Sequence, residues 1–252
     1  MRDENTDMLE ILCRAEEGDT DAMMDVVMYM MINGNKDFFQ PAMQERYWKY
    51  IRKLADAGNQ TAYIWMGSEY ECGDHVPPSA KKAIEYYQKA VNAGIEFGNE
   101  CIALMYYSGK LVPADYKKAY EYLMKPKRRQ STCAKFLLGE MFRCGLYVER
   151  NARKACYYYK QATHVTTKYD VQDAYYWPSC FRLGQAKHYG KGIRKNIVEG
   201  RELVNQALYY YYNPEENSNT KYYDVSGISK QEIESELRSI EKDITNTLEK
   251  GE

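Results

Sequence analysis

The chain has 252 residues and a formal net charge of -1, with 35 basic and 36 acidic side chains. Hydrophobic residues make up 44% of the sequence and charged residues 28%, so the chain can bury a core. Charges of both signs are interspersed along the whole sequence. No block of one sign suggests a nucleic-acid-binding arm or an acidic tail.

The sequence gives no sign of export or membrane insertion. Residues 1–5 contain no apolar signal core, and the longest apolar run, residues 26–32, is far shorter than the roughly 20 residues that span a bilayer. The seven cysteines are an odd number and lack the spacing of a secreted disulfide framework. We therefore expect a cytoplasmic protein with reduced thiols and no contact with a membrane.

The first predicted element is an amphipathic helix over residues 6–17, which we interpret as an N-terminal cap within residues 1–17. The segment from Gly18 to Ala22 resembles the segment from Gly58 to Ala62 at an interval of 40 residues. It therefore predicts a first repeat over residues 18–57, with its second helix over residues 44–57.

Small residues recur with a fixed period through the middle of the chain. Three sets keep an interval of 36 residues: Gly73, Gly109 and Gly145; Ala83, Ala119 and Ala155; and Gly67, Ala103 and Gly139. A fixed period of this length is typical of stacked supersecondary units rather than of a globular enzyme core. The stack predicts one continuous core shared by all repeats.

The repeat over residues 58–93 shows how each unit is built. Apolar and small residues at helical spacing predict a first helix that ends at Gly73, where a left-handed backbone costs least. The prolines of residues 74–78 predict a loop, and a second helix follows over residues 80–92. Adding 36 gives repeats 94–129 and 130–165. An interval of 45 gives a repeat over 175–210, after a connection at Val165–Trp177. The main contact with a partner protein could be made by this connection or by a groove along the repeats.

The C-terminal region, residues 213–252, is predicted as a polar loop and an amphipathic helix. Ser229 and Glu232 form a capping box at the start of this helix. Its apolar stripe consists of Ile233, Leu237, Ile240, Ile244 and Leu248. The stripe suits a helix that caps the last repeat, and a homodimer through this helix is the alternative.

These landmarks resemble the Sel-one-like repeat (SLR) family, a relative of the tetratricopeptide repeats. The similarity rests on Leu138-Gly139 with Phe142 and Gly145, on Leu183-Gly184 with Gly190 and Gly192, and on the Lys-Ala pairs Lys82-Ala83, Lys118-Ala119 and Lys154-Ala155. It covers about residues 18–210. The resemblance implies an all-α fold, an α-solenoid of antiparallel helix pairs wound into a right-handed superhelix.

The resemblance also implies a function and a surface. Proteins similar to this chain are mostly non-catalytic scaffolds or adaptors, and in the tetratricopeptide fold the first helix of each repeat lines the concave face. Carried over by repeat position, that partner-binding face comprises eleven residues, which we call the groove positions: Met28, Ile64, Glu71, Glu100, Tyr107, Phe136, Glu140, Arg143, Phe181, Gln185 and His188. Apolar anchors mixed with charges suit a protein or peptide laid in a groove.

No motif indicates catalysis. Nucleophile elbow, phosphate loop and zinc-binding helix motifs are missing from the sequence, and the single Cys-x-x-His, at Cys72 and His75, lacks the other two ligands of a zinc site. Cys180 and His188 fall two turns apart on one predicted helix without an orienting third group. We expect no enzyme activity, no catalytic residue, no metal site and no cofactor.

Two other functions stay open. An inhibitor or immunity-type protein that blocks a single partner enzyme would use the same groove. The 26 tyrosines could stack on single-stranded nucleic acid, although the repeat register assigns many of them to helix packing and the near-zero net charge argues against this function.

Overall fold

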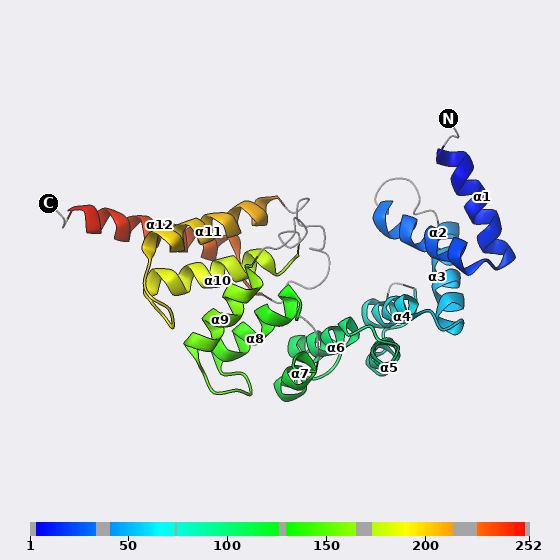
Figure 1. The fold of residues 1–252 in the computed structure, drawn as a ribbon, viewed down its shortest axis with the longest axis horizontal. Coiled ribbons are helices and arrows are strands. Elements are labelled where there is room, and N and C mark those ends of the chain that lie inside the picture. Colours follow the sequence, from blue (N-terminus) through cyan, green and yellow to red (C-terminus); the bar gives the residue numbers. More distant parts are fainter. Residues whose placement is uncertain are drawn as a thin grey trace. The chain divides into compact units, whose positions relative to one another are not determined.

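The computed structural model describes residues 4–33, 41–73, 75–125, 130–164, 173–213 and 226–249, and every regular element within these ranges is an α-helix. The chain divides into two compact units, residues 1–114 and 115–252, which are described separately (Figure 1). The first unit contains α1 (Glu4–Glu17), α2 (Thr20–Asn33), α3 (Pro41–Asp56), α4 (Gln60–Cys72), α5 (Ala80–Asn92) and α6 (Phe97–Ser108). The second contains α7 (Tyr116–Leu123), α8 (Thr132–Cys144), α9 (Ala152–Ala162), α10 (Tyr176–Tyr189), α11 (Ile197–Tyr212) and α12 (Lys230–Glu249).

Within each unit, helices pack mainly on their neighbours in the chain. In the first unit each helix contacts the next, from α1 to α6, and in the second unit the same holds from α7 to α12. The second unit adds contacts of α8 with α10 and of α10 with α12, which are helices two steps apart. This nearest-neighbour packing is that of a helical solenoid, so the predicted all-α class is confirmed. Its handedness and a single core through all repeats stay predictions.

The turns between paired helices follow the sequence pattern. The helices α4 and α8 end at Gly73 and Gly145, whose φ angles of 80° and 74° lie in the left-handed region that glycine adopts most easily. The second helices begin at N-caps spaced by 36, 36 and 45 residues, and each cap side chain accepts a hydrogen bond from the backbone N–H three residues later. These caps are Ser79, Asp115, Asn151 and Asn196. Caps and terminators together fix where each pair of helices reverses.

Aromatic side chains hold the two helices of a pair together in the same way in both units. Tyr70 of α4 stacks on Tyr86 of α5 with ring centroids 5.7 Å apart, and Phe142 of α8 stacks on Tyr158 of α9 at the same distance. The two pairs are 72 residues apart, which is two periods of the repeat. The prediction that the abundant aromatics serve helix packing is therefore confirmed for these positions.

Glycine allows the helices of a pair to approach closely. A Cβ atom added at Gly67 of α4 would lie 2.4 Å from Cε1 of Tyr87 on α5. A Cβ atom at Gly139 of α8 would lie equally close, 2.4 Å, to Cε1 of Tyr159 on α9. Both distances are far below van der Waals contact, so a larger residue would force the helices apart.

The apolar stripe of α12 packs inside the second unit. Ile233 and Ile240 are fully buried in a cluster with residues of α10 and α11, among them Trp177, whereas Leu248 near the end of the stripe is 69% exposed. Most of the stripe is therefore used within the chain, and a homodimer through this helix stays a prediction. Trp177, expected in the connection before the last repeat, lies instead in the first turn of α10, and residues 165–172 fall outside the described residues.

The close approach at Gly139 gives a stability prediction. We expect Gly139→Val to lower the melting temperature and to cost roughly 1–3 kcal/mol of unfolding free energy, because the new side chain meets the Tyr159 ring. Chemical denaturation followed by circular dichroism measures the effect. Lys160→Val, at an exposed position of α9, is the control for placing a β-branched residue in a helix. A Gly139→Val protein as stable as this control would contradict the assigned contact.

Candidate functional site

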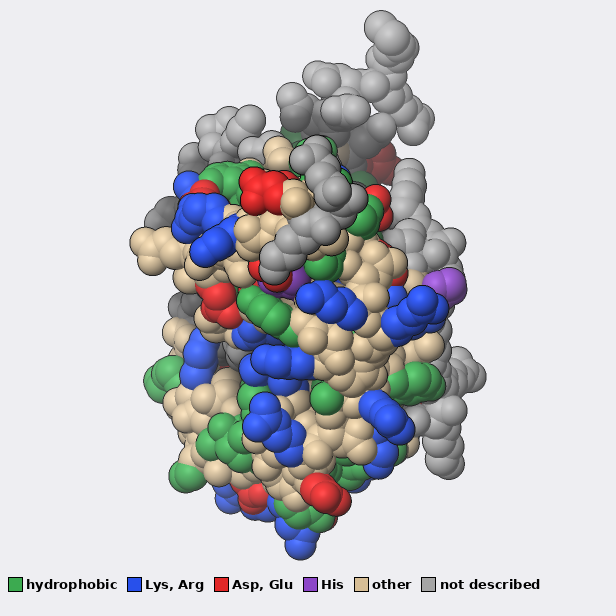
Figure 2. Space-filling view, turned by 90° about the vertical axis from the view of Figure 1, so that its left-hand side faces the viewer, with side chains coloured by type: hydrophobic (Ala, Val, Ile, Leu, Met, Phe, Trp, Pro, Cys, Tyr) green, Lys and Arg blue, Asp and Glu red, His purple; other side chains and the backbone are tan. Residues whose placement is uncertain are grey.

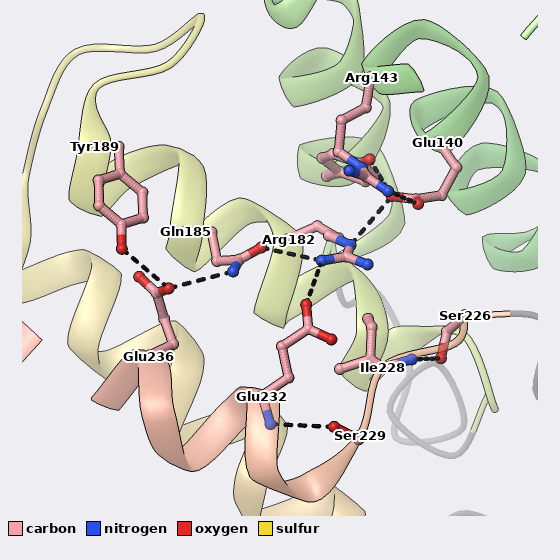
Figure 3. A network of polar contacts seen from close by, with 11 residues as sticks. Glu140, Arg143, Arg182, Gln185, Tyr189, Ser226, Ile228, Ser229, Glu232 and Glu236 are labelled. Carbon is pink, nitrogen blue, oxygen red and sulfur yellow. Dashed lines mark hydrogen bonds and ion pairs between the residues drawn. The ribbon is translucent and has the colours of Figure 1, made fainter. Parts of the chain in front are cut away.

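In the second unit, groove positions of α8 and α10 come together with α12. Arg182 of α10 lies between them: Nη1 donates to Oε1 of Glu232 at 3.0 Å and to Oε1 of Gln185 at 3.1 Å (Figure 3). On its other side, Nε lies 3.3 Å from Oε1 of Glu140, although Nε makes no hydrogen bond among the described residues. The Arg182 side chain is only 10% exposed, so this cation joins three helices from a buried position.

Glu140 is the buried acid of this group, with 4% of its surface exposed. It accepts hydrogen bonds from Nε and Nη2 of Arg143 and from the hydroxyl of Tyr159 on α9. Burial raises the pKa of Glu140, but the Arg143 hydrogen bond, the nearby charges of Arg182 and Arg143 and the Tyr159 hydroxyl outweigh it. The net result is a pKa below the ordinary value, and the carboxylate form is stabilised.

A second acid, Glu236 of α12, gathers polar groups of α10. Nδ1 of His188 lies 2.7 Å from its Oε1, while Nε2 of Gln185 and the hydroxyl of Tyr189 donate to its Oε2 at 3.2 and 3.3 Å. The other ring nitrogen of His188 lies 3.0 Å from Oδ2 of Asp243. Two groove positions, Gln185 and His188, therefore already contact a helix of the same chain.

Four groove positions are buried rather than on the surface. Phe136, Phe181 and His188 have no exposed surface, and Glu140 has almost none. Phe136 of α8 packs on the rings of Tyr159 on α9 and of Tyr175, the N-cap of α10, so its own second helix and the following repeat both cover it. These four side chains cannot touch a partner while the helices stay packed, which corrects their expected exposure.

The groove positions of the first unit are more accessible. Met28 of α2 is 42% exposed, and the neighbouring Met31 is 49% exposed. Ile64, Glu71, Glu100 and Tyr107 are partly exposed. The carboxylate of Glu71 also accepts a hydrogen bond from the Tyr87 hydroxyl at 2.6 Å. Partner binding by these residues and by Arg143 and Gln185 stays a prediction.

Cys180, His75 and His188 have partners outside the cysteine and histidine pairs of the sequence. Cys180 is fully buried, its Sγ donates to Oε1 of Gln206, and burial raises the pKa of the thiol to about 12. His75 lies 2.7 Å from Glu69 and stacks on Trp48 instead of joining Cys72 in a metal site. Within the described ranges, His, Cys, Asp and Glu side chains form no group of three or more that could hold a metal ion.

The described thiols differ in their access to solvent. Cys133, Cys156 and Cys180 are buried, whereas Cys72 and Cys144, which end α4 and α8, are exposed, as is Cys13. A thiolate at a buried apolar position is disfavoured, so these buried cysteines act as small core residues.

Sequence reasoning missed the acids that α12 brings to the site. Glu232 was recognised only as part of the capping box, and its backbone N–H does bond to Oγ of Ser229 at 3.2 Å. Glu232, Glu236 and Asp243 follow at intervals of four and seven, which places them along one side of the helix. This spacing was a visible signal, but it did not reveal which basic residues they would meet.

Comparison with known proteins identifies the family. The Sel1 repeat family model matches residues 60–95, 102–125, 134–164 and 177–212, which is half of the chain. The chain therefore belongs to the Sel1 repeat family, as the sequence resemblance predicted. Repeats of this family are generally protein–protein interaction modules.

A solved structure shares the fold at low sequence identity. The chain is similar to c5321, a protective antigen of uropathogenic Escherichia coli strains with an SLR fold, with 18% identity and a TM-score of 0.52 over 97% of this chain and 64% of that chain. A Sel1 repeat protein from Oxalobacter formigenes matches with 21% identity and a TM-score of 0.49, over 82% of this chain and 56% of that one. The chain thus spans less than two thirds of the length of either protein.

A search of curated proteins gave no match to the chain. Among the helices of the described residues, none combines the length and apolar character that crossing a membrane requires.

The depressed pKa of Glu140 gives a pH prediction. A depressed folded-state pKa adds stability above the unfolded-state pKa, and this contribution disappears as the pH falls below about 4.5, the ordinary value for Glu. We expect Glu140→Gln, which keeps the shape and loses the charge, to be less stable than the wild-type protein at pH 7. The gap in melting temperature should narrow as the pH falls toward 3.5. A gap that widens in acid would contradict the ion pairs at Glu140.

Proposed function

We propose that the chain is a non-catalytic scaffold that binds a partner protein or peptide on the face formed by the first helices of its repeats. The observation that carries the proposal is the contact of Gln185 and His188 with α12, because groove positions of α10 hold a helix within the chain itself. In these contacts the amide of Gln185 and the imidazole of His188 lie within hydrogen-bond distance of the carboxylates of Glu236 and Asp243. A partner helix could be bound in the same way elsewhere on the array.

The first unit offers the more open part of this face. Met28 and Met31 lie three residues apart on α2 and expose apolar surface on the same side of the helix. Methionine side chains adapt to different partners because they are flexible and polarisable. Partly exposed Glu71 on α4 and Glu100 and Tyr107 on α6 add polar and aromatic side chains to the first helices of this unit. This mixture favours a protein ligand over a small molecule.

A site-specific photocrosslinking experiment tests the proposal. We expect a benzoylphenylalanine at Met28 or Tyr107 of the full chain, expressed in its native host, to form an adduct with one defined protein. The same probe at Lys81, an exposed residue of the second helix α5, is the matched control and should not form it. Adducts that appear equally at Lys81, or only there, would contradict binding through the first helices.

The purified partner then gives a quantitative prediction. We expect the exposed double substitution Met28→Gln with Met31→Gln to weaken binding by about tenfold, since two apolar anchors are lost while the core is untouched. Isothermal titration calorimetry measures the change, and circular dichroism checks the fold. Unchanged affinity would show that Met28 and Met31 do not contribute to partner binding. A single tight enzyme partner would favour the inhibitor function, and an adduct with nucleic acid would overturn the protein-binding proposal.

A further inference from the structure

The second unit contains a pocket of about 180 Å³, and every charged residue that lines it is basic. It lies among α8, α9 and α10 and the two loops that follow α8 and α10. The lining contains no acidic side chain, and its basic, amide and phenol groups are Arg143, Arg150, Tyr159, Arg182, Gln185, Tyr189 and Lys191. Four basic groups around one small cavity make a site for a negatively charged group.

The arginines of this pocket keep donors that internal bonds do not use. Arg143, whose side chain is 40% exposed, binds Glu140 through Nε and Nη2, and its Nη1 is not part of this pair of bonds. Arg182, nine-tenths buried, uses Nη1 for Gln185 and Glu232. Its Nε lies 3.3 Å from Oε1 of Glu140 but makes no hydrogen bond among the described residues. A buried guanidinium N–H that makes no hydrogen bond is costly, and an added carboxylate would offer the Nε of Arg182 a better-aligned acceptor.

Two further cations lie at the rim. Arg150 and Lys191 are exposed, and neither forms an ion pair within the described ranges. The Lys191 ammonium lies 5.0 Å from the centroid of the Tyr189 ring, and its backbone oxygen accepts a hydrogen bond from the Cys156 thiol. That hydrogen bond joins the loop after α10 to α9 beside the pocket.

The surface around the pocket extends the positive charge. Arg153, Lys154, Arg194 and Lys195 are exposed on the same two segments as Arg150 and Lys191. A Cβ atom added at Gly192 would lie 2.4 Å from the backbone of Ala152, which shows that these segments are in direct contact. Lys and Arg side chains spread across the middle of the face in Figure 2, while acidic side chains lie mainly toward its edges.

We propose that this pocket binds a carboxylate side chain of an acidic peptide segment in the partner protein. The inference rests on the proposed scaffold function and names the chemistry of the partner. The chain itself supports a carboxylate ligand, because Glu232 and Glu236 of α12 already bind Arg182, Gln185 and Tyr189 from the neighbouring side. One acidic residue enters the pocket, and its acidic neighbours in the peptide contact the basic loops.

The test uses the full chain and a synthetic peptide of alternating glutamate and alanine, with the glutamine–alanine peptide as its neutral match. We expect saturable shifts of the Arg143, Arg150 and Arg182 Nε–H signals in nitrogen-15 NMR spectra with the glutamate peptide only. The double variant Arg150→Gln with Lys191→Gln should weaken binding by at least about fivefold. The control Lys117→Gln with Lys160→Gln removes the same charge from exposed positions outside the pocket and should change affinity less than about twofold.

The other outcomes overturn either the inference or the proposed function on which it rests. Equal weakening by both double variants would mean unspecific charge attraction. Absence of shifts, or equal shifts with the glutamine peptide, would exclude a carboxylate site. Displacement of the glutamate peptide by an equal concentration of inorganic phosphate would assign the pocket to phosphate. A partner crosslinked at Met28, with no arginine shift on addition of the glutamate peptide, would defeat this inference alone. Binding of the peptide without any crosslinked partner would defeat the proposed function.

Discussion

The contact between a first-helix glycine and a second-helix tyrosine sets the geometry of two helix pairs, α4 with α5 and α8 with α9. Gly67 meets the ring of Tyr87, and Gly139 meets the ring of Tyr159 two periods later. Since the ring occupies the space where a Cβ atom would be, the two helix axes come close and the tyrosine hydroxyl reaches across to the first helix. There it donates to Glu71 in one repeat and to Glu140 in the other. In each of these two repeats, the tyrosine hydroxyl therefore binds a glutamate at a groove position.

Sequence reasoning predicted the elements well because their signals are local. A glycine that must adopt a left-handed backbone, as Gly73 and Gly145 do, marks a helix end without knowledge of the rest of the fold. N-caps such as Asn151 act over three residues, and the aromatic pairs follow directly from the period. Fold class and family could therefore be read from the sequence.

The site was predicted less well because its contacts are long-range. Glu232 and Glu236 meet α10 residues about 50 positions earlier in the chain, and no local pattern specifies which helix α12 packs against. Phe136 and Phe181 were expected on the surface because they occupy repeat positions that line the concave face in the tetratricopeptide fold. Both are fully buried, because the position of a residue within its repeat does not determine its exposure where another helix covers it. Burial of a side chain depends on which helices pack on it, and that packing is set by the tertiary structure.

The exposed cysteines at the ends of α4 and α8 make a natural pair of reporter positions. Cys72 and Cys144 occupy the same place in two repeats, one residue before the terminating glycine, and they belong to different units. Fluorophores attached to both thiols, with Cys13 replaced by serine, would sit in matched surroundings. Energy transfer between the dyes would then report any bending between the two halves of the molecule in solution, and a change on ligand addition would show that the scaffold flexes as it engages.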